Sequence, residues 1–449
     1  MPRAALLKRL ALWFFAGSLL LCGQSAHPIT LEAALARTLE KNPAIQEAKA
    51  RLEEAAGRRL VLRASALPDA LVIVPGGLQG GHRAGEKSVQ PFTFARGYLN
   101  QPLFNAGIPP AYRRGNIEQL LAQQRLNLAV MDQLHTARIA FYTACYEDAM
   151  RALGEAQRER LEGNAKTQSD RYQAGQSDRV ALTIARILEQ EVKPRVEESR
   201  RRSSGALLQL AQTMGDDLGS GATLPSAEGR MQFAAADLNV ETEAAAALRR
   251  RPDLEIARLL IRAAGEDQRI LEAAYYPALN ATVSGDYIPV SEIRRGSEGS
   301  ARRSDDIISS EARAGAAYSW RVVDNGRVGG AVLRQRAARA ANEAVLAKLE
   351  GDVPRELTRI QHSLRALSAR HESLEKAVRV SEETVTDVLN NLTEGLSSQL
   401  EYRTAENSFL QTKAGVLTVA FEQKLALAEL DRLTGRYFQF SDDTSEKLH

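Results

Sequence analysis

Side chains that could bind metals or transfer protons are scattered along the chain. The histidines show no spacing typical of metal ligands, and neither a His-Glu-x-x-His helix nor a cysteine cluster accompanies them. There are six of them: His27, His82, His135, His362, His371 and His449. We also find no Gly-x-Ser-x-Gly elbow and no Gly-Lys-Ser/Thr phosphate loop. The sequence therefore predicts no catalytic residue, no metal site, no cofactor and no enzymatic activity.

One glycine-rich stretch, residues 76–81, could suggest a phosphate cradle. Such a cradle needs a following Lys-Ser/Thr pair and the start of a helix, and this stretch has neither. We therefore interpret it as a loop that connects two strands.

The amino-terminal residues 1–26 have the pattern of a secretory signal peptide. Three basic residues, Arg3, Lys8 and Arg9, precede an apolar run over 10–21, and small residues follow it. The run of about 12 residues is shorter than the roughly 20 needed for a transmembrane helix. The sequence therefore predicts export.

Removal of this leader changes the electrostatics of the chain. The 59 Lys and Arg residues minus the three in the leader leave 56, equal to the 56 Asp and Glu residues. A near-neutral protein gives no support for nucleic-acid binding. Cys22 follows a Leu-Leu-Leu run and is a candidate lipidation site, although lipoprotein sites have a small residue where Leu21 stands. If the leader over 1–26 is removed, Cys145 is the one remaining cysteine, so no internal disulfide is expected.

The sequence pattern of the elements that would position any site occurs twice along the chain. Asn42-Pro43 recurs as Arg251-Pro252 and Pro68 as Pro277, both 209 residues later. Farther on, the stretch ending at Gly107 matches the one ending at Gly326, and the turn at Gly175 matches that at Gly395, at offsets of 219 and 220. Four ordered matches predict an internal duplication with an insertion in one loop of the second copy.

Long helical hairpins form the main part of each copy. In the first copy, apolar residues recur at coiled-coil spacing from about 109 to 214, with a turn at Gly175. In the second copy, the same pattern covers about 327 to 435 and turns at Gly395. A helix of about 65 residues extends about 100 Å. Pro194 and Pro354 lie inside these stretches and predict kinks or short breaks.

Each copy also contains a predicted β-hairpin, at about 70–104 and about 278–323. Residues 279–287 alternate strictly between apolar and polar side chains. Alternating strands of about 10 residues are typical of outer-membrane barrels. Four strands are too few to close a barrel, and lipid does not tolerate open strand edges, so closure requires oligomerisation. Aromatic residues near the strand ends would form a sparse membrane girdle: Phe92, Phe94, Tyr98, Tyr287, Tyr318 and Trp320.

The chain is thus divided into a signal peptide over 1–26, a first repeat over 27–220, a second repeat over 221–437 and a tail over 438–449. The predicted fold class is mainly α with a small β part, as two tandem repeats of long coiled-coil helices with a β-hairpin each.

In its duplication and in four loose motifs, the mature chain resembles the TolC-like outer-membrane efflux proteins. The motifs are Asn42-Pro43, Tyr276-Pro277, Asp324-Asn325-Gly326 and the turn over 172–177. The resemblance implies a homotrimer whose chains together form a 12-stranded β-barrel in outer-membrane lipid, continued by an α-helical barrel through the periplasm. It also implies an exit duct for tripartite efflux or type I secretion, with an inner-membrane transporter and a periplasmic adaptor (membrane-fusion) protein as partners.

The resemblance places the periplasmic tip, where the adaptor docks, at the two helical turns. These comprise Gly175, Gln176, Ser177, Gly395, Leu396 and Ser397. An acidic residue near the second turn projects into the aperture of the family, which here corresponds to Glu401, with Tyr402, Arg403 and Asp178 nearby. Three copies of Glu401 would make a negative ring that favours cations. The chain departs from the pattern at Thr404, where a second acid is expected, and at Ala181, the first-copy equivalent of Glu401.

Other interpretations compete with this one. A periplasmic coiled-coil scaffold or adaptor that never enters the membrane would explain the helices and the signal peptide, but not the paired β-hairpins. An enzyme held in the cell envelope would require a convergent polar pocket, which the sequence does not indicate. For Glu401 itself, the alternative is a solvated helix residue without a gating role.

Overall fold

A computed structural model describes residues 28–80, 89–216, 224–236, 238–287 and 310–436. The signal peptide, Cys22 and the tail over 438–449 lie outside the described residues. The chain divides into two compact units. One comprises residues 1–47, 127–251 and 351–449, and the other comprises residues 48–126 and 252–350. We call them the hairpin unit and the sheet unit.

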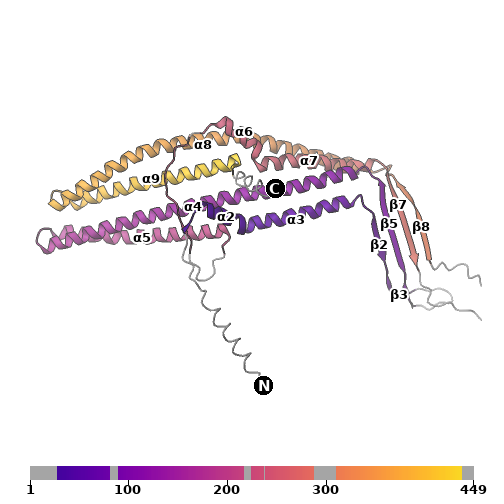
Figure 1. The fold of residues 1–449 in the computed structure, drawn as a ribbon, viewed down its shortest axis with the longest axis horizontal. Coiled ribbons are helices and arrows are strands. Elements are labelled where there is room, and N and C mark those ends of the chain that lie inside the picture. Colours follow the sequence, from indigo (N-terminus) through magenta and orange to yellow (C-terminus); the bar gives the residue numbers. More distant parts are fainter. Residues whose placement is uncertain (1–27, 81–88, 217–223, 237, 288–309, 437–449) are drawn as a thin grey trace, which may run out of the picture. The chain divides into compact units, whose positions relative to one another are not determined.

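The sheet unit contains a four-stranded antiparallel sheet with the order β2-β5-β7-β8 (Figure 1). Its strands are β2 (Asp69–Ile73), β5 (Ala95–Phe104), β7 (Ala278–Tyr287) and β8 (Ser310–Ser319). A second ladder pairs β3 (Gly76–Gly80) with β4 (Val89–Thr93). The predicted glycine-rich loop is therefore wrong for residues 76–80, which form a strand because a full ladder of backbone pairs with β4 holds them extended.

Four helices follow or precede these strands at one end of the sheet. They are α3 (Pro43–Ala64), α4 (Ile108–Gln173), α7 (Pro252–Glu272) and α8 (Arg327–Glu394), with a short 3-10 turn η1 (Ala273–Tyr275) before β7. Ion pairs join neighbours in this series: Arg58–Glu118 between α3 and α4, Arg114–Asp267 between α4 and α7, and Arg258–Glu350 between α7 and α8. The helix order α3-α4-α7-α8 thus repeats the strand order.

The hairpin unit is built from the distal parts of α4 and α8 and their return helices, α5 (Arg179–Met214) and α9 (Gln399–Thr434) (Figure 1). The proline-induced breaks that we expected are absent, because α5 continues through Pro194 and α8 through Pro354. Buried neighbours explain this: Val192 and Val196 flank Pro194, and Val353 precedes Pro354. Packing of these side chains beside each proline offsets the lost backbone bond.

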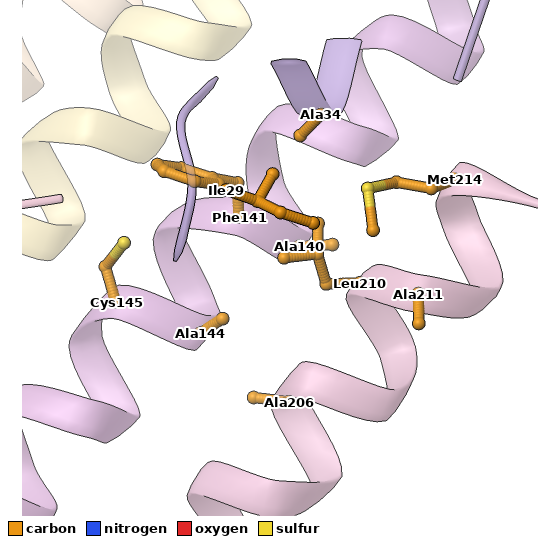
Figure 2. Packing of buried hydrophobic residues seen from close by; sticks show 10 residues of the cluster. All are labelled: Ile29, Ala34, Ala140, Phe141, Ala144, Cys145, Ala206, Leu210, Ala211 and Met214. Atoms are coloured by element: carbon orange, nitrogen blue, oxygen red, sulfur yellow. The ribbon is translucent and has the colours of Figure 1, made fainter. Parts of the chain in front are cut away.

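Shorter elements complete the hairpin unit. Two 11-residue helices, α2 (Leu31–Lys41) and α6 (Val240–Arg250), begin at the side-chain caps Thr30 and Asn239. A parallel pair joins β1 (Pro28–Ile29) to β6 (Ser226–Ala227). Figure 2 shows Ile29 of β1 in the core, with Phe141 and Cys145 of α4 and Leu210 and Met214 of α5. The β1–β6 pair was not predicted, because a two-residue strand carries no periodic signal.

The segment between the repeats crosses the helices as a strap, residues 224–236. Gly229 lies against Cys145 and Phe141 of α4, where a Cβ would come within 2.8 Å of the Cys145 sulfur. The buried Gln423 of α9 exchanges hydrogen bonds with the backbone of Ala234, accepting from its N–H and donating to its carbonyl. Phe233 stacks on His371 of α8 with ring centroids 4.1 Å apart. The strap therefore ties α4, α8 and α9 together.

Candidate functional site: a two-faced sheet and a polar hairpin end

The β2-β5-β7-β8 sheet has one predominantly apolar face, set by the strand register. Leu279, Ala281, Val283 and Gly285 of β7 lie on it, and their partners on β8 are Tyr318, Ala316, Ala314 and Ala312. Leu99 of β5 opposes Val283 on the same face. Gln101 is an exception, and its amide donates to the carbonyls of Ala66 and Pro102. Val283 is 46% exposed, so this apolar face is open in the single chain.

The opposite face carries the polar and charged residues of the central strands. Asn280, Thr282 and Ser284 alternate with the apolar set on β7. Arg96 on β5 pairs with Asp286 on β7 at 2.6 Å, and Arg313 pairs with Glu311 on β8 at 2.6 Å. One face thus suits hydrocarbon and the other suits water, which is the dyad pattern of a membrane barrel wall.

The edges of this sheet are open among the described residues. β2 pairs only with β5, and β8 pairs only with β7, so the outer row of backbone groups on each has no strand partner. An open edge beside an apolar face cannot stand in lipid, because unpaired N–H and C=O groups there cost several kcal/mol each. The sheet is complete only when other strands join both edges.

Aromatic side chains gather where the second hairpin meets the helices. Tyr318 and Trp320 are exposed at the end of β8, and the Trp320 indole donates to the carbonyl of Tyr275 at 3.1 Å. Tyr275 and Tyr276 are exposed beside them and were not among the predicted girdle residues. Tyr287 lies at the other end of β7, and the side chain of Phe92 lies outside the described residues. Tyr and Trp at strand ends are typical of a membrane interface.

The two helical turns have the same backbone geometry. Gly175 and Gly395 have φ of 73° and 81°, a region that favours glycine. The N–H of Gln176 donates to the Arg171 carbonyl at 2.8 Å, and that of Leu396 donates to the Asn391 carbonyl at the same distance. This six-to-one bond is the Schellman ending of a helix. Ser177 and Ser397 follow in these turns, and the Ser177 hydroxyl donates to Gln168 at 3.1 Å.

Two of the predicted gate acids cap helices. The carboxylate of Asp178 accepts from the N–H of Ala181 at 2.7 Å as the N-cap of α5. Glu401 forms a capping box with Ser398: its carboxylate accepts from the Ser398 N–H at 2.9 Å, and the Ser398 hydroxyl accepts from the Glu401 N–H at 3.2 Å. Both acids remain exposed, so capping leaves them accessible to ions.

The residues after Glu401 differ in their surroundings. Tyr402 is only 1% exposed and packs among Leu161, Val385 and Phe409; burial raises the pKa of its phenol to about 12. Arg403 is exposed and pairs with Glu191 of α5 at 3.3 Å. In the single chain Tyr402 is therefore a core residue of the hairpin unit, whereas Glu401 and Arg403 are at its surface.

A buried polar layer next to Tyr402 was missed by sequence reasoning. Glu406, 2% exposed, accepts from the Arg160 guanidinium of α4 at 2.8 and 3.0 Å. Asn164 donates to the buried Gln399 at 3.0 Å. Both contacts join α4 to α9. The sequence contains only a weak signal for this layer. Glu406 lies four residues after Tyr402 and therefore on the same helix face, but this spacing alone does not show that the face is buried.

The described part of the chain shows little that could support metal chemistry or a helical membrane span. No group of three or more His, Cys, Asp and Glu side chains in it could hold a metal ion. None of its helices is long and apolar enough to cross a membrane.

Comparisons with known proteins agree with this geometry. Residues 244–436 match the family model described as outer membrane efflux protein. The matched residues lie within the predicted second repeat. The predicted resemblance to this family is thereby confirmed. Comparison with curated proteins found no significant sequence match.

Solved outer-membrane channels share the fold of the chain. The outer membrane protein VceC of Vibrio cholerae is 18% identical with a TM-score of 0.72, over 90% of this chain and 96% of that one. The CmeC channel of Campylobacter jejuni is 13% identical with a TM-score of 0.72, over 90% and 85%. The open-state MtrE channel of Neisseria gonorrhoeae is 18% identical with a TM-score of 0.69, over 90% and 88%. The predicted fold class is confirmed, and the likeness extends over both repeats.

Proposed function

We propose that the protein is the outer-membrane exit duct of a tripartite efflux pump or a type I secretion system. The observation that carries the proposal is the two-faced sheet with two open edges, in a chain that has the fold of outer-membrane channels. A coiled-coil scaffold outside the membrane would leave the exposed apolar face without a role.

Three copies would satisfy the open edges of the sheet. β8 of one chain would pair with β2 of the next, so that three chains of four strands each close a twelve-stranded barrel. Closure removes every edge, which is the condition for spanning lipid. The polar face, with Arg96–Asp286 and Arg313–Glu311, would then line a water-filled passage. The helix order α3-α4-α7-α8 would continue this wall as a helical tunnel into the periplasm.

The duct is proposed to be passive and not an enzyme. It would guide small molecules or proteins outward without a cofactor, and an inner-membrane transporter would supply the energy. A periplasmic adaptor would dock on the two turns at Gly175 and Gly395, where Leu396 is exposed. A ring of Glu401 side chains at the aperture would favour cations.

Matched substitutions on the two sheet faces test the membrane assignment. Val283→Arg places a charge at mid-strand on the apolar face, at a cost of about 2–4 kcal/mol in lipid. Thr282→Arg places the same charge one residue away on the polar face. We expect Val283→Arg to deplete the protein from outer-membrane fractions, and Thr282→Arg to leave its amount there unchanged. Equal membrane levels of the two variants would contradict a lipid-facing apolar face.

A further inference from the structure

A pocket of about 550 Å³ lies in the hairpin unit among α4, α8 and α9. Its volume is in the range of small-molecule sites, about 300–1,000 Å³. Small and branched apolar side chains form most of its wall: Ala149, Ala152, Ala156, Val378, Val416 and Leu417. The three alanines recur on one face of α4, where their short side chains leave room beside the helix backbone.

The charged side chains around the pocket are mostly cations. Arg160 is already paired with Glu406. The Lys413 ammonium lies 5.0 Å from the centroid of the Phe409 ring, and no carboxylate of the described residues pairs with it. Arg379 likewise has no ion pair within the described chain. The one acid in the lining, Glu375, faces His371 at 3.9 Å. Positive charge therefore exceeds negative charge beside an apolar cavity.

We propose that this pocket binds an amphipathic organic anion, with the apolar body among the alanines and the acidic group on Lys413 and Arg379. Both the shape and the charge of the pocket favour this class of ligand. The pocket walls would remove the apolar surface of the ligand from water, and its acidic group would form ion pairs with the two cations. The site goes beyond a passive duct, because it gives the periplasmic helices a ligand of their own. Its lining lies within one chain, so it does not depend on the membrane assignment.

Thiol protection measures binding at this site directly. Ala156→Cys places a thiol in the wall, and the full-length mature protein in lipid nanodiscs is labelled with a methanethiosulfonate reagent at about pH 8. The wild-type chain gives the background, which is low because Cys145 is buried and its thiol pKa is raised to about 11 by desolvation. The probes are 1-anilinonaphthalene-8-sulfonate and N-phenyl-1-naphthylamine, which share an aromatic body and differ in the sulfonate.

The sulfonate probe should protect the introduced thiol saturably, at about tenfold lower concentration than the uncharged probe, the factor expected from one charge-assisted hydrogen bond. In the same background, Lys413→Gln should abolish this preference. Lys376→Gln is the matched control, because Lys376 is a surface lysine of α8 paired with Glu372. It should leave the preference intact.

Three results would overturn the proposal. Equal protection by the two probes, or a preference that survives both Lys413→Gln and Arg379→Gln, would show that the cations recognise no anion. An introduced thiol that cannot be labelled even without a probe would show that another copy or a partner covers the pocket. Trimer formation and conductance are measured on the same protein, so failure of the anion site is distinguishable from failure of the proposed duct.

Discussion

At the scale of single residues, the carboxylate of Glu406 is buried between α4 and α9, with Arg160 as its cationic partner. Removal of one partner of a buried pair leaves an uncompensated charge. We predict that Arg160→Leu lowers the free energy of unfolding by about 3–5 kcal/mol. The measurement is chemical denaturation followed by helical circular dichroism. Arg201→Ala is the control, because the Arg201–Glu198 pair is exposed at the surface and should contribute little to the free energy of unfolding. Similar losses for both variants would contradict the structural role of the Arg160–Glu406 pair.

The capping box at Ser398 and Glu401 makes it possible to separate capping from gating. Ser398→Ala and Glu401→Ala each break the box, at a cost of about 1 kcal/mol. Only Glu401→Ala removes a charge from the proposed aperture. We therefore expect Glu401→Ala alone to lower cation selectivity in single-channel recordings. A selectivity unchanged by Glu401→Ala, or changed equally by Ser398→Ala, would leave Glu401 as a cap.

Individual residues could be predicted from the sequence where the backbone conformation favours one residue type. Gly175 and Gly395 could be predicted as turn positions, because positive φ favours glycine. The burial of Tyr402 and Glu406 could not be predicted, because it depends on which face of α9 meets α4. The pocket beside Lys413 was missed for the same reason, since its wall combines α4 with α8 and α9, which lie far from α4 in sequence.

At the scale of elements, the duplication accounts for most of the architecture. α5 and α9 both have 36 residues and both end at a left-handed glycine, Gly215 and Gly435. α2 and α6 both have 11 residues and both begin at a side-chain cap. The repeated turns made the long helical hairpins predictable from sequence, whereas the short helices α2 and α6 were not predicted. The strand at Gly76–Gly80 could not, because glycine has low β propensity and only its ladder with β4 holds it extended.

The glycine that ends α5 offers a matched test of this capping. Gly215 has φ of 77°, and a Cβ there would come within 2.6 Å of the Lys41 carbonyl oxygen. Gly205, inside the same helix, has open space around it. We predict that Gly215→Ala destabilises the protein by more than about 1 kcal/mol, whereas Gly205→Ala stabilises it by up to about 1 kcal/mol. Thermal unfolding measures both. A neutral Gly215→Ala would mean that α2 and the end of α5 do not pack as described.

At the scale of the whole molecule, the proposed duct depends on the assembly of three chains into a trimer. Among the described residues, the β2-β5-β7-β8 sheet of a single chain has four strands, an apolar face and two open edges, which no monomer can hold in lipid. Oligomerisation itself stays a prediction from the sequence, because the alternating strands are too few to close a barrel. The number of copies came from the resemblance to the efflux family, since a strand pattern does not determine the symmetry of an assembly.

The most direct test is the size and conductance of the protein extracted from outer-membrane fractions. Gel migration with and without heating measures the oligomer, and planar bilayers measure the conductance of the same material. We predict a heat-dissociable trimer that forms ion-conducting pores. A monomer, or an oligomer that is recovered without membranes and does not conduct, would contradict the proposed duct and favour a periplasmic coiled-coil scaffold.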